Sequence, residues 1–402
     1  MNKRIFLIPF FAVLFGIMGC QNDKPQTSEK SIQANLDESA DFIKVAIKEG
    51  YKEDWIPRGM HNDGTIKFCG KGFDWTEGFF PGLCWDLYFY TKDEEFKKAA
   101  EYFQNKFENH KLKTTNHDLG FIFNNSFGKS YRLTGNETHR DVLIQASESL
   151  ITRFNPTVGC IKSWDTSGGW QAKRGWMFPV IIDNMMNLEM LFEASLITGD
   201  KKYYDVAVAH ANTTLKNHFR DDYSSFHVVD YDPETGEIRY KQTAQGYAHE
   251  SAWSRGQAWG LYGYTLCYRY TKDEKYLDLA EKIANYVLSH KNLPEDKVPY
   301  WDYNAPLIPN EPRDASAAAI IASALVEHDG YSKIDFLTPA KEMLKSLSSE
   351  KYKTGGKDNI FILGHSVGSI PHGGEVDVPI VYADYYYVEA LLRLLELEIN
   401  EL

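Results

Sequence analysis

The sequence predicts an all-α protein, an (α/α)6 barrel in which six helical hairpins form a toroid with a small β-hairpin on its rim. Three observations support this fold class. The chain repeats a helix–turn–helix unit, its helices alternate between two hydrophobic patterns, and the candidate helices form about six pairs. An open superhelix of hairpins is the alternative, and the number of pairs favours the closed ring.

The repeated unit is visible in four segments, FYTKDEEFKKAAEYF, RLTGNETHRDVLIQA, LITGDKKYYDVAVAHA and RYTKDEKYLDLAEKIA. Each contains a Thr-(Gly/Lys)-(Asp/Asn) turn, whose threonine is Thr91, Thr134, Thr198 or Thr271. Asp or Asn at this position is typical of a helix N-cap, because its side chain accepts hydrogen bonds from free backbone N–H groups. Spacings of about 45 to 75 residues fit one helical hairpin per repeat, with loops of variable length.

The two helices of each hairpin differ in their hydrophobic pattern. The second helix of the last segment has one apolar stripe, formed by Tyr276, Ala280, Ile283 and Val287, which is typical of a helix with one face in water. The first helices are apolar nearly all round, as is ASAAAIIASALVEH from Ala315, and this pattern predicts burial in an inner ring. The outer and inner helices are predicted, pair by pair, at residues 34–51 and 81–90, 94–110 and 118–133, 137–155 and 183–198, 201–219 and 252–270, 274–290 and 314–327, and 335–347 and 380–396.

Three segments depart from the helical pattern. FHVVDYDPETGEIRYKQTAQG has β-branched residues around a DPETG turn and predicts the β-hairpin on the rim. NDGTIKFCGKGFDWTEGFFPG and GCIKSWDTSGGWQAKRGW are loops rich in Gly and Trp. Loops that hold exposed aromatic side chains above a rigid scaffold often carry function.

The N-terminal stretch MNKRIFLIPFFAVLFGIMGCQNDK predicts export. Lys3 and Arg4 precede a short apolar run, and the small residue Gly19 stands before Cys20, as in a secretion signal rather than a spanning helix. IMGC resembles a bacterial lipobox, which implies lipid attachment at Cys20 and an envelope lipoprotein, periplasmic or associated with the outer membrane. A plain signal peptide is the alternative. We therefore divide the chain into a lipoprotein signal peptide at residues 1–20, a polar flexible tether at residues 21–32 and a single (α/α)6 domain at residues 33–402.

The composition excludes some classes of partner and site. The formal net charge of −12 argues against a nucleic-acid partner, which would need a basic surface, although a few arginines in a cleft still permit an anionic ligand. The cysteines after Cys20 are widely spaced and show no C-x-x-C pair, so neither a zinc site nor a disulfide framework is indicated. No later segment is long and apolar enough to span a membrane, so we expect a lipid anchor to be the sole membrane contact.

Polar residues gather in the long loops that lead into the inner helices. Because the short turns lie at one end of the barrel, these loops must lie at the other end, around the mouth of one cavity. The loops end in NHDLGF, IIDNMM, HESAWSRGQAW and PRDASAAA. They place His117, Asp118, Asp183, Arg255, Gln257, Trp259, Arg313 and Asp314 at one rim.

A carboxylate in front of an apolar helix is most often an N-cap, and we keep this interpretation for Asp314. Asp118 and Asp183 differ, because His117 adjoins the first and Asn184 the second. We therefore expect these two carboxylates to face the cavity, although Asp183 can also help to start its helix.

Arg255 needs an anionic partner, because it lies within an inner apolar helix. His117 and His227 fit packing and a binding site equally well, and Trp259 alone would be a core residue. Together, however, these residue types suit a sugar acid. Tryptophan stacks on sugar rings, arginine binds carboxylates, and two carboxylates in different environments divide into acid and base.

Eight motifs in order are similar to those of a known family. They are FDWTEGFFPG, NHDLGFIF, KSWD, IIDNMMNLEMLFEA, FHVVDYDPETGEI, QGYAHESAWSRGQAWGLYG, RDASAAAI and VYADYYYVEALLRL. The chain resembles the unsaturated glucuronyl hydrolases, glycoside hydrolase family 88. This resemblance implies an (α/α)6 barrel that acts downstream of polysaccharide lyases and removes the 4,5-unsaturated uronic acid from the non-reducing end of their oligosaccharide products. It also implies that no metal or organic cofactor is needed.

The implied reaction is hydration of a vinyl ether, in which C4 is protonated, water adds at C5, and the hemiketal opens and expels the neighbouring sugar. Because nothing is displaced at the anomeric carbon, the usual rule on carboxylate spacing does not apply. Asp183 resembles the family's general acid and base. Asp118 resembles its partner, which would hold sugar hydroxyls, stabilise developing positive charge and raise the pKa of Asp183 by like-charge repulsion. Burial and Asp118 must outweigh the helix N-terminus, which lowers a carboxylate pKa.

The resemblance also implies roles for other residues. Four residues match the pocket residues that hold the uronate and water in the family, namely His227, Gln245, Arg255 and Trp259. Those matching the groups that line the sugar sites are His117, Trp75, Phe79 and Trp164. The loop GHSVGSIPHGG, with Ser366, is expected near the second sugar.

Two alternatives are other enzymes, and a third is a binding protein. An ordinary (α/α)6 glycosidase or sugar epimerase is disfavoured by the combination of NHDLGF and WSRGQAW. A hydrolase of unsaturated galacturonyl products of pectin is disfavoured by Asp118 as a second rim carboxylate. A non-catalytic glycan-binding lipoprotein would have no need for Asp183. The candidate substrates are unsaturated disaccharides from chondroitin, hyaluronan, heparin or related uronate polymers.

Overall fold

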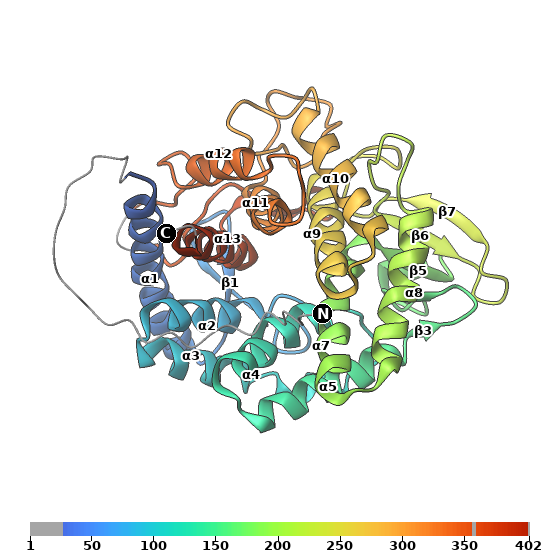
Figure 1. Cartoon of the computed structure of the whole chain (residues 1–402), viewed down its shortest axis with the longest axis horizontal. Coiled ribbons are helices and arrows are strands. Elements are labelled where there is room, and N and C mark those ends of the chain that lie inside the picture. Colours follow the sequence, from blue (N-terminus) through green and yellow to red (C-terminus); the bar gives the residue numbers. More distant parts are fainter. Residues whose placement is uncertain (1–26, 356–358, 401–402) are drawn as a thin grey trace.

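Helices alternate between an outer and an inner ring around one axis (Figure 1). The computed structural model describes residues 27–355 and 359–400. Within these ranges the outer ring consists of α1 (Thr27–Glu53), α3 (Glu94–Gln104), α5 (Glu137–Ile151), α8 (Lys201–Asn217), α10 (Glu274–Ser289) and α12 (Leu337–Leu347). The inner ring consists of α2 (Phe79–Thr91), α4 (Lys129–Thr134), α7 (Leu188–Thr198), α9 (Ser254–Thr271), α11 (Ala315–Asp329) and α13 (Val381–Asn400). Because α13 packs against both α1 and α2, the ring is closed, and the predicted (α/α)6 barrel is confirmed.

The short turns between inner and outer helices have the predicted capping. The side chains that accept a hydrogen bond from a backbone N–H of the following helix are those of Asp93, Asn136, Asp200 and Asp273. The preceding inner helices end at a left-handed residue, which is Lys92, Gly135, Gly199 or Lys272. These turns lie at the end of the barrel that we call the base, and the long loops lie at the end that we call the mouth.

Two inner helices do not begin as α-helices. The segment predicted as a helix at 118–133 starts with the π-helix η2 (Gly120–Gly128), which continues into α4. The segment predicted at 183–198 starts with the 3-10 helix η3 (Ile182–Asn187), which continues into α7. Such departures from α geometry are frequent at functional sites, and here they follow Asp118 and contain Asp183. The outer helix predicted at 94–110 ends earlier, at Gln104, and the 3-10 helix η1 (Glu108–Leu112) follows.

Helix α1 begins inside the segment predicted as a tether. It starts at Thr27, so the tether prediction is wrong for residues 27–32. The buried residues Ile32 and Leu36 show why, because they continue the apolar stripe of α1 by one further turn. The predicted signal peptide and Cys20 lie outside the described residues.

The β-structure is more extensive than the single predicted hairpin. That hairpin is confirmed as β6 (Val228–Tyr231) and β7 (Ile238–Gln242), and β5 (Phe178–Ile181) joins it as a third, antiparallel strand. The strands of two to five residues are too short to show an alternating pattern in the sequence. The further antiparallel pairs are β1 (Pro57–Met60) with β2 (Ile66–Phe68), β3 (Phe154–Asn155) with β4 (Cys160–Ile161), and β8 (Ser366–Ser369) with β9 (Gly374–Val378).

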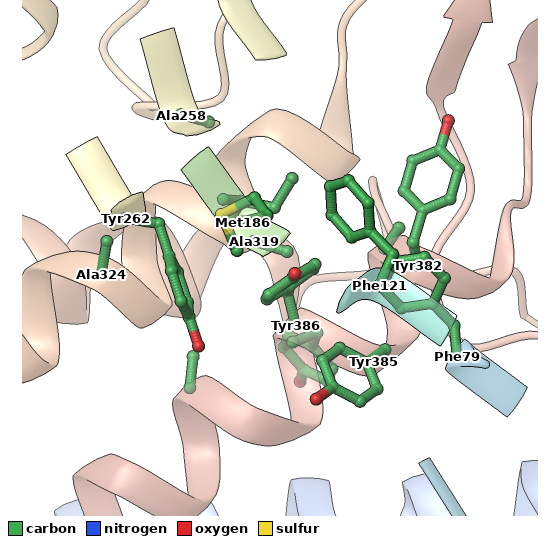
Figure 2. Close-up of a cluster of buried hydrophobic side chains, with 14 of the residues drawn as sticks. Phe79, Phe121, Met186, Ala258, Tyr262, Ala319, Ala324, Tyr382, Tyr385 and Tyr386 are labelled. Carbon is green, nitrogen blue, oxygen red and sulfur yellow. The ribbon is translucent and has the colours of Figure 1, made fainter. Parts of the chain in front are cut away.

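Aromatic side chains of the inner helices fill the bore of the barrel (Figure 2). The ring of Phe79 lies 5.3 Å from that of Tyr385 and 5.7 Å from that of Phe121. The ring of Tyr386 lies 5.5 Å from that of Tyr262. These tilted and edge-to-face arrangements are the favourable ones for aromatic pairs, and they close the bore beneath the mouth.

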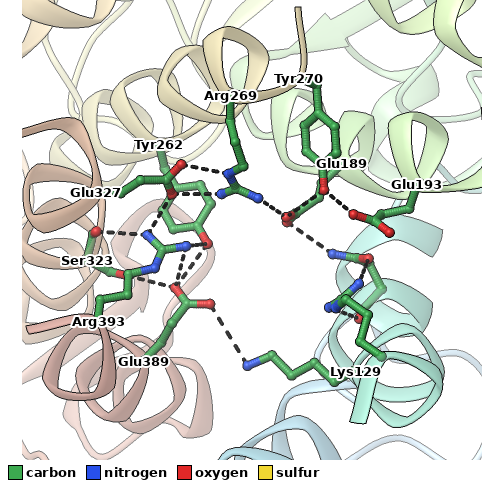
Figure 3. Close-up of polar contacts among 12 residues, drawn as sticks. Lys129, Glu189, Glu193, Tyr262, Arg269, Tyr270, Ser323, Glu327, Glu389 and Arg393 are labelled. Carbon is green, nitrogen blue, oxygen red and sulfur yellow. Dashed lines mark hydrogen bonds and ion pairs between the residues drawn. The ribbon is translucent and has the colours of Figure 1, made fainter. Parts of the chain in front are cut away.

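Charged side chains from all six inner positions meet nearer the base, in a network that we call the base ring. Figure 3 labels its members from α4, α7, α9, α11 and α13. Arg269 donates two hydrogen bonds of 2.6 and 2.7 Å to Glu327 and also contacts Glu189. Arg393 lies 3.1 Å from Glu327. The remaining members are Asp86, Lys129, Arg132, Glu193 and Glu389. The base ring therefore links all six hairpins through ion pairs.

Two findings bear on the membrane and the cysteines. The helices of residues 27–355 and 359–400 include none with the length and apolar character needed to cross a bilayer. Cys69, Cys84, Cys160 and Cys267 are buried and free.

Candidate active site

A cavity of about 400 Å³ opens at the mouth of the barrel, a size typical of small-molecule sites. Four of the predicted site residues line it, namely Trp75, Asp118, Trp164 and Gln245. They come from loops that are far apart in the sequence, as predicted from the arrangement of long loops and short turns. The other predicted site residues lie in the buried layer around it.

Asp183 lies where a strand becomes a helix. Strand β5 pairs with β6, and the ladder continues for one more bond, in which the Ile182 N–H donates to the His227 carbonyl at 3.0 Å. The next residue, Asp183, therefore lies beside His227, with its Oδ2 3.6 Å from His227 Nε2. The N-cap position of η3 is Ile181, so Asp183 does not cap its helix. Its Oδ2 is buried and has no hydrogen-bond partner in the described part of the chain.

Asp118 lies on the cavity wall, just before η2. Its backbone N–H donates to Asn116 Oδ1 at 2.8 Å. Asn116 in turn forms an antiparallel bridge with Trp164, which brings the KSWD loop beside Asp118. The Asp118 side chain is 11% exposed, and its Oδ1 lies 3.3 Å from His117 Nε2.

Burial raises the pKa of both carboxyls. It raises the pKa of Asp183 to about 7, against the attraction of Arg255 and the indole N–H of Trp259, which lies near the carboxyl without a direct hydrogen bond. It raises the pKa of Asp118 to about 8, and the charge of Asp183 adds to this shift. The main cause for Asp183 is thus burial rather than the expected repulsion by Asp118. The two groups interact and release their protons as a pair, so the site keeps a proton near neutral pH.

The two histidines beside these carboxyls are neutral. Burial lowers the pKa of His117 to about 3. Burial, with Arg255 nearby, also lowers the pKa of His227 well below its ordinary value. Neither Nε2 atom has a hydrogen-bond partner among the described residues. Neutral rings of this kind act as hydrogen-bond donors or acceptors rather than as cations.

Arg255 is buried and already has an anionic partner. It donates to Asp314 Oδ2 at 3.1 Å, to the Gly368 carbonyl at 2.5 Å and to the Val367 carbonyl. Asp314 also caps α11, as predicted, by accepting the backbone N–H of Ser316 at 3.1 Å. Among the nitrogens of Arg255 in the described structure, Nε alone is buried without a partner. The structure thus gives Arg255 a different main anion from the expected substrate carboxylate.

Comparison with known proteins identifies the family. The model of Glycosyl Hydrolase Family 88 matches residues 54–395. The chain belongs to glycosyl hydrolase family 88. It is 42% identical to an unsaturated glucuronyl hydrolase of Formosa agariphila over 98% of each chain. It is 36% identical to an unsaturated chondroitin disaccharide hydrolase of Streptococcus pneumoniae, over 80% of this chain and 81% of the relative.

A solved structure agrees with this assignment. The crystal structure of an unsaturated glucuronyl hydrolase specific for heparin superimposes with a TM-score of 0.87 and 41% identity, covering 92% of this chain and 99% of that one. This family 88 protein is therefore a glycoside hydrolase with the barrel of its relatives.

Three residues expected at the sugar or water sites of the family 88 cavity are buried next to it. Phe79 is fully buried, and its ring meets that of Trp75 edge-on at 5.8 Å, so it supports a lining residue rather than lining the cavity. Trp259 is also fully buried, near the Asp183 carboxyl. Ser366 begins β8 and is buried, whereas Ser369 at the other end of β8 lines the cavity. Residues three apart in a strand point to opposite faces, which explains the difference.

The sequence prediction missed several groups of the mouth. Arg58 on β1 lines the cavity and donates to Glu375 on β9 at 2.7 and 3.0 Å, while its third nitrogen contacts Asp74. Trp170 and His372 also line the cavity, with their rings 5.0 Å apart. The Gly- and Trp-rich loop was a signal for Trp170. No signal connected Arg58 with Glu375, because 317 positions separate them.

The described residues bring no three His, Cys, Asp or Glu side chains together in a way that would hold a metal ion. That the reaction needs no cofactor stays a prediction.

Proposed function

We propose that this family 88 hydrolase removes the 4,5-unsaturated uronic acid from the non-reducing end of glycosaminoglycan-type oligosaccharides. The observation that carries this proposal is the pair Asp183 and Asp118, whose pKa values burial raises to about 7 and about 8 beside a cavity lined by tryptophans. Hydration of a vinyl ether needs an acid that still holds its proton near neutral pH, and a raised carboxyl pKa supplies one. The names of the relatives, unsaturated glucuronyl hydrolase and unsaturated chondroitin disaccharide hydrolase, agree with this chemistry.

The proposed reaction uses the Asp183 carboxyl twice, first as an acid and then as a base. Because the two carboxyls titrate as a pair, the form that reacts holds one proton, on Asp183. Asp183 gives this proton to C4, and positive charge develops at C5 and the ring oxygen, where the Asp118 carboxylate stabilises it. Water then bonds to C5 while its proton passes to the Asp183 carboxylate, which restores the acid. The hemiketal opens by breaking the bond between C5 and the ring oxygen. C1 then releases the neighbouring sugar as an alcohol, so the net change is the addition of one water molecule.

The lining tryptophans Trp75, Trp164 and Trp170 offer apolar faces to the sugar rings. The relatives differ in their named substrates, which include a chondroitin disaccharide and heparin. The linkage that this enzyme prefers must therefore be determined by direct comparison of substrates.

The test is a panel of lyase-generated unsaturated disaccharides with glucuronyl, iduronyl-derived and galacturonyl ends. We expect loss of the ultraviolet absorbance of the double bond together with release of the second sugar, fastest on a glycosaminoglycan disaccharide. Turnover that is fastest on the galacturonyl product would indicate that the natural substrate comes from pectin. Folded protein that binds these sugars without any loss of absorbance would instead support a glycan-binding lipoprotein.

The place of the protein in the cell is also a proposal. We propose that Cys20 carries a lipid anchor in the bacterial envelope and that polysaccharide lyases supply the substrate, because β-elimination creates its double bond. Replacement of Cys20 by serine should move the protein from the membrane fraction to the soluble fraction. An unchanged distribution would contradict the anchor without affecting the proposed reaction.

A further inference from the structure

His227 lies between a backbone turn and Asp183. Its Nδ1 accepts hydrogen bonds from the backbone N–H groups of Ala244 and Gln245, both at 3.1 Å, and lies 3.4 Å from the Thr243 hydroxyl. A backbone N–H can only donate, so Nδ1 is the nitrogen without a proton. The neutral ring therefore carries its proton on Nε2.

The Nε2 atom faces Asp183. The distance of 3.6 Å to Oδ2 is longer than a hydrogen bond, and both atoms are buried without another partner among the described residues. The ring cannot easily turn, because it packs against Trp253 at 4.5 Å and meets Trp164 edge-on at 6.1 Å. Hydrogen bonds of this kind are often long without substrate and shorten in the reacting complex.

The surroundings of His227 exclude the protonated ring. A proton on Nδ1 would point at two N–H groups. The other charged or titratable groups that act on the ring are Arg255, Arg174, His218 and His372, which all disfavour a second positive charge. Asp183 is the one carboxylate recorded within ion-pair distance of the ring among the described residues.

We propose that His227 is a fixed N–H donor to Asp183, with its tautomer set by the Thr243–Gln245 turn, and that it transfers no proton itself. This inference rests on the proposed function. When Asp183 gives its proton to C4, negative charge develops on its carboxylate, and the Nε2–H group is already directed at it. Donors that are in place before charge develops lower the barrier without any reorganisation. His227 is thus a positioning residue that acts through Asp183.

The first test is the tautomer itself, which does not depend on activity. Nitrogen NMR of the intact protein with ¹⁵N-labelled histidine, assigned through the signal lost in His227→Asn, should show an unprotonated Nδ1 and a protonated Nε2. This pattern should stay unchanged from about pH 5 to about pH 9, where an ordinary histidine titrates. A protonated Nδ1, or titration within this range, would overturn the proposal.

The second test uses a pair of variants. In His227→Asn the amide oxygen still accepts the N–H groups of the turn, but no donor reaches Asp183. In His227→Gln the longer amide places a donor near the position of Nε2. We expect kcat to fall about 100-fold in His227→Asn and clearly less in His227→Gln, with KM nearly unchanged and both limbs of the pH profile retained. Loss of one limb in His227→Asn would show that His227 does transfer a proton.

A matched control separates these effects from general damage. The tautomer of His210 is fixed in the same way, because its Nδ1 accepts the Ile161 N–H at 3.1 Å. Its side chain is buried, and its Nε2 has no hydrogen-bond partner among the described residues. No ion-pair contact with a carboxylate is recorded for it in the described structure, so His210→Asn should keep near-normal turnover per folded molecule. An equal loss in His210→Asn and His227→Asn would contradict a specific role for His227. Absence of turnover by the unmodified protein would count against the proposed function, while the tautomer result would stand.

Discussion

Buried carboxyls occur at both ends of the barrel, but their partners differ. In the base ring, burial acts to raise the pKa of Glu327, yet Arg269 and Arg393 lower it to about 2. At the mouth, burial raises the pKa of Asp183 to about 7, and Arg255, whose side chain is bound by Asp314, opposes this only in part. The same type of side chain is thus a permanent anion near the base and a proton donor at the mouth.

The comparison shows that this barrel obtains its acid by leaving a carboxyl unpaired. A buried ion pair supports structure only when both partners are present, and the base ring meets this condition with arginines on several helices. Perturbed carboxyls without a cation contact are candidates for functional sites, and Asp118 and Asp183 at the mouth meet this description. Burial also raises the pKa of Asp384 to about 8, but a backbone N–H group donates to each of its two oxygens. Asp86 is an instructive intermediate case. Burial raises its pKa to about 6 although Lys129 pairs with it.

The largest expected effect comes from removing the acid at the mouth. Replacing Asp183 by asparagine should lower kcat at least about 10³-fold, because general acid–base catalysis contributes effects of this order. Substrate binding and folding should be largely kept. Absorbance-based rates and a binding titration would test this. Asp86→Asn in the base ring is the matched control and should keep its kcat. Retention of most activity in Asp183→Asn would exclude the proposed acid.

The base ring should show the opposite behaviour, with an effect on stability and little on chemistry. Replacing Arg269 by methionine leaves Glu327 and Glu189 short of a cation and should lower the free energy of unfolding by about 3 kcal/mol. Chemical denaturation would measure this, together with kcat per folded molecule. The double variant with Arg269→Met and Glu327→Gln should lose less free energy of unfolding than the sum of the losses in the two single variants, because Arg269→Met has already broken the ion pair. A strong loss of kcat in a stable Arg269→Met protein would contradict the division between the two ends.

The pH dependence should also differ between the ends. At the mouth the folded pKa of Asp183, about 7, lies above its unfolded value of about 3.9. Its contribution to stability is therefore complete below about pH 4 and is lost as the pH rises through about 7. We expect kcat to fall above this pH, and Asp183→Asn to gain in melting temperature over the unmodified protein between about pH 5 and pH 9.

In the base ring, the stability contributed by Glu327 changes with pH in the opposite direction. The folded pKa of Glu327, about 2, lies below its unfolded value of about 4.3. Its contribution is present above about pH 4 and is lost as the pH falls through about 2. Glu327→Gln should therefore lose stability against the unmodified protein at neutral pH and approach it in acid. Melting curves across the pH range would show whether the two variants shift in opposite directions.

The smallest expected effect is at the cavity wall. Trp164→Ala removes one sugar-stacking face and should raise KM about 5-fold while kcat changes little, since a stacked aromatic contact contributes about 1 kcal/mol. Steady-state rates on the preferred disaccharide would measure this. A fall in kcat as large as that of Asp183→Asn would mean that Trp164 does more than bind.

The fold and the two carboxyls were predictable because they rest on local patterns. Repeated turns and helix periodicity predict the barrel, and the alternation of long loops with short turns predicts that Asp118 and Asp183 share one end. Contacts between distant segments were not predictable. Arg255 pairs with Asp314 across 59 positions. The four residues of strand β5 show no alternating pattern that would predict a strand, yet the pairing of β5 with β6 places Asp183 beside His227.

The closed base has a consequence for how a chain of sugars is processed. The buried aromatic side chains of Figure 2 close the bore between the mouth and the base ring of Figure 3, so we expect the cavity at the mouth to be blind, with one entrance. A polysaccharide cannot thread through the barrel, and only a chain end can reach Asp183. Both products must leave by the path on which the substrate entered. The enzyme is therefore expected to trim one terminal residue per encounter, in a distributive manner, with the remainder of the oligosaccharide lying outside the mouth.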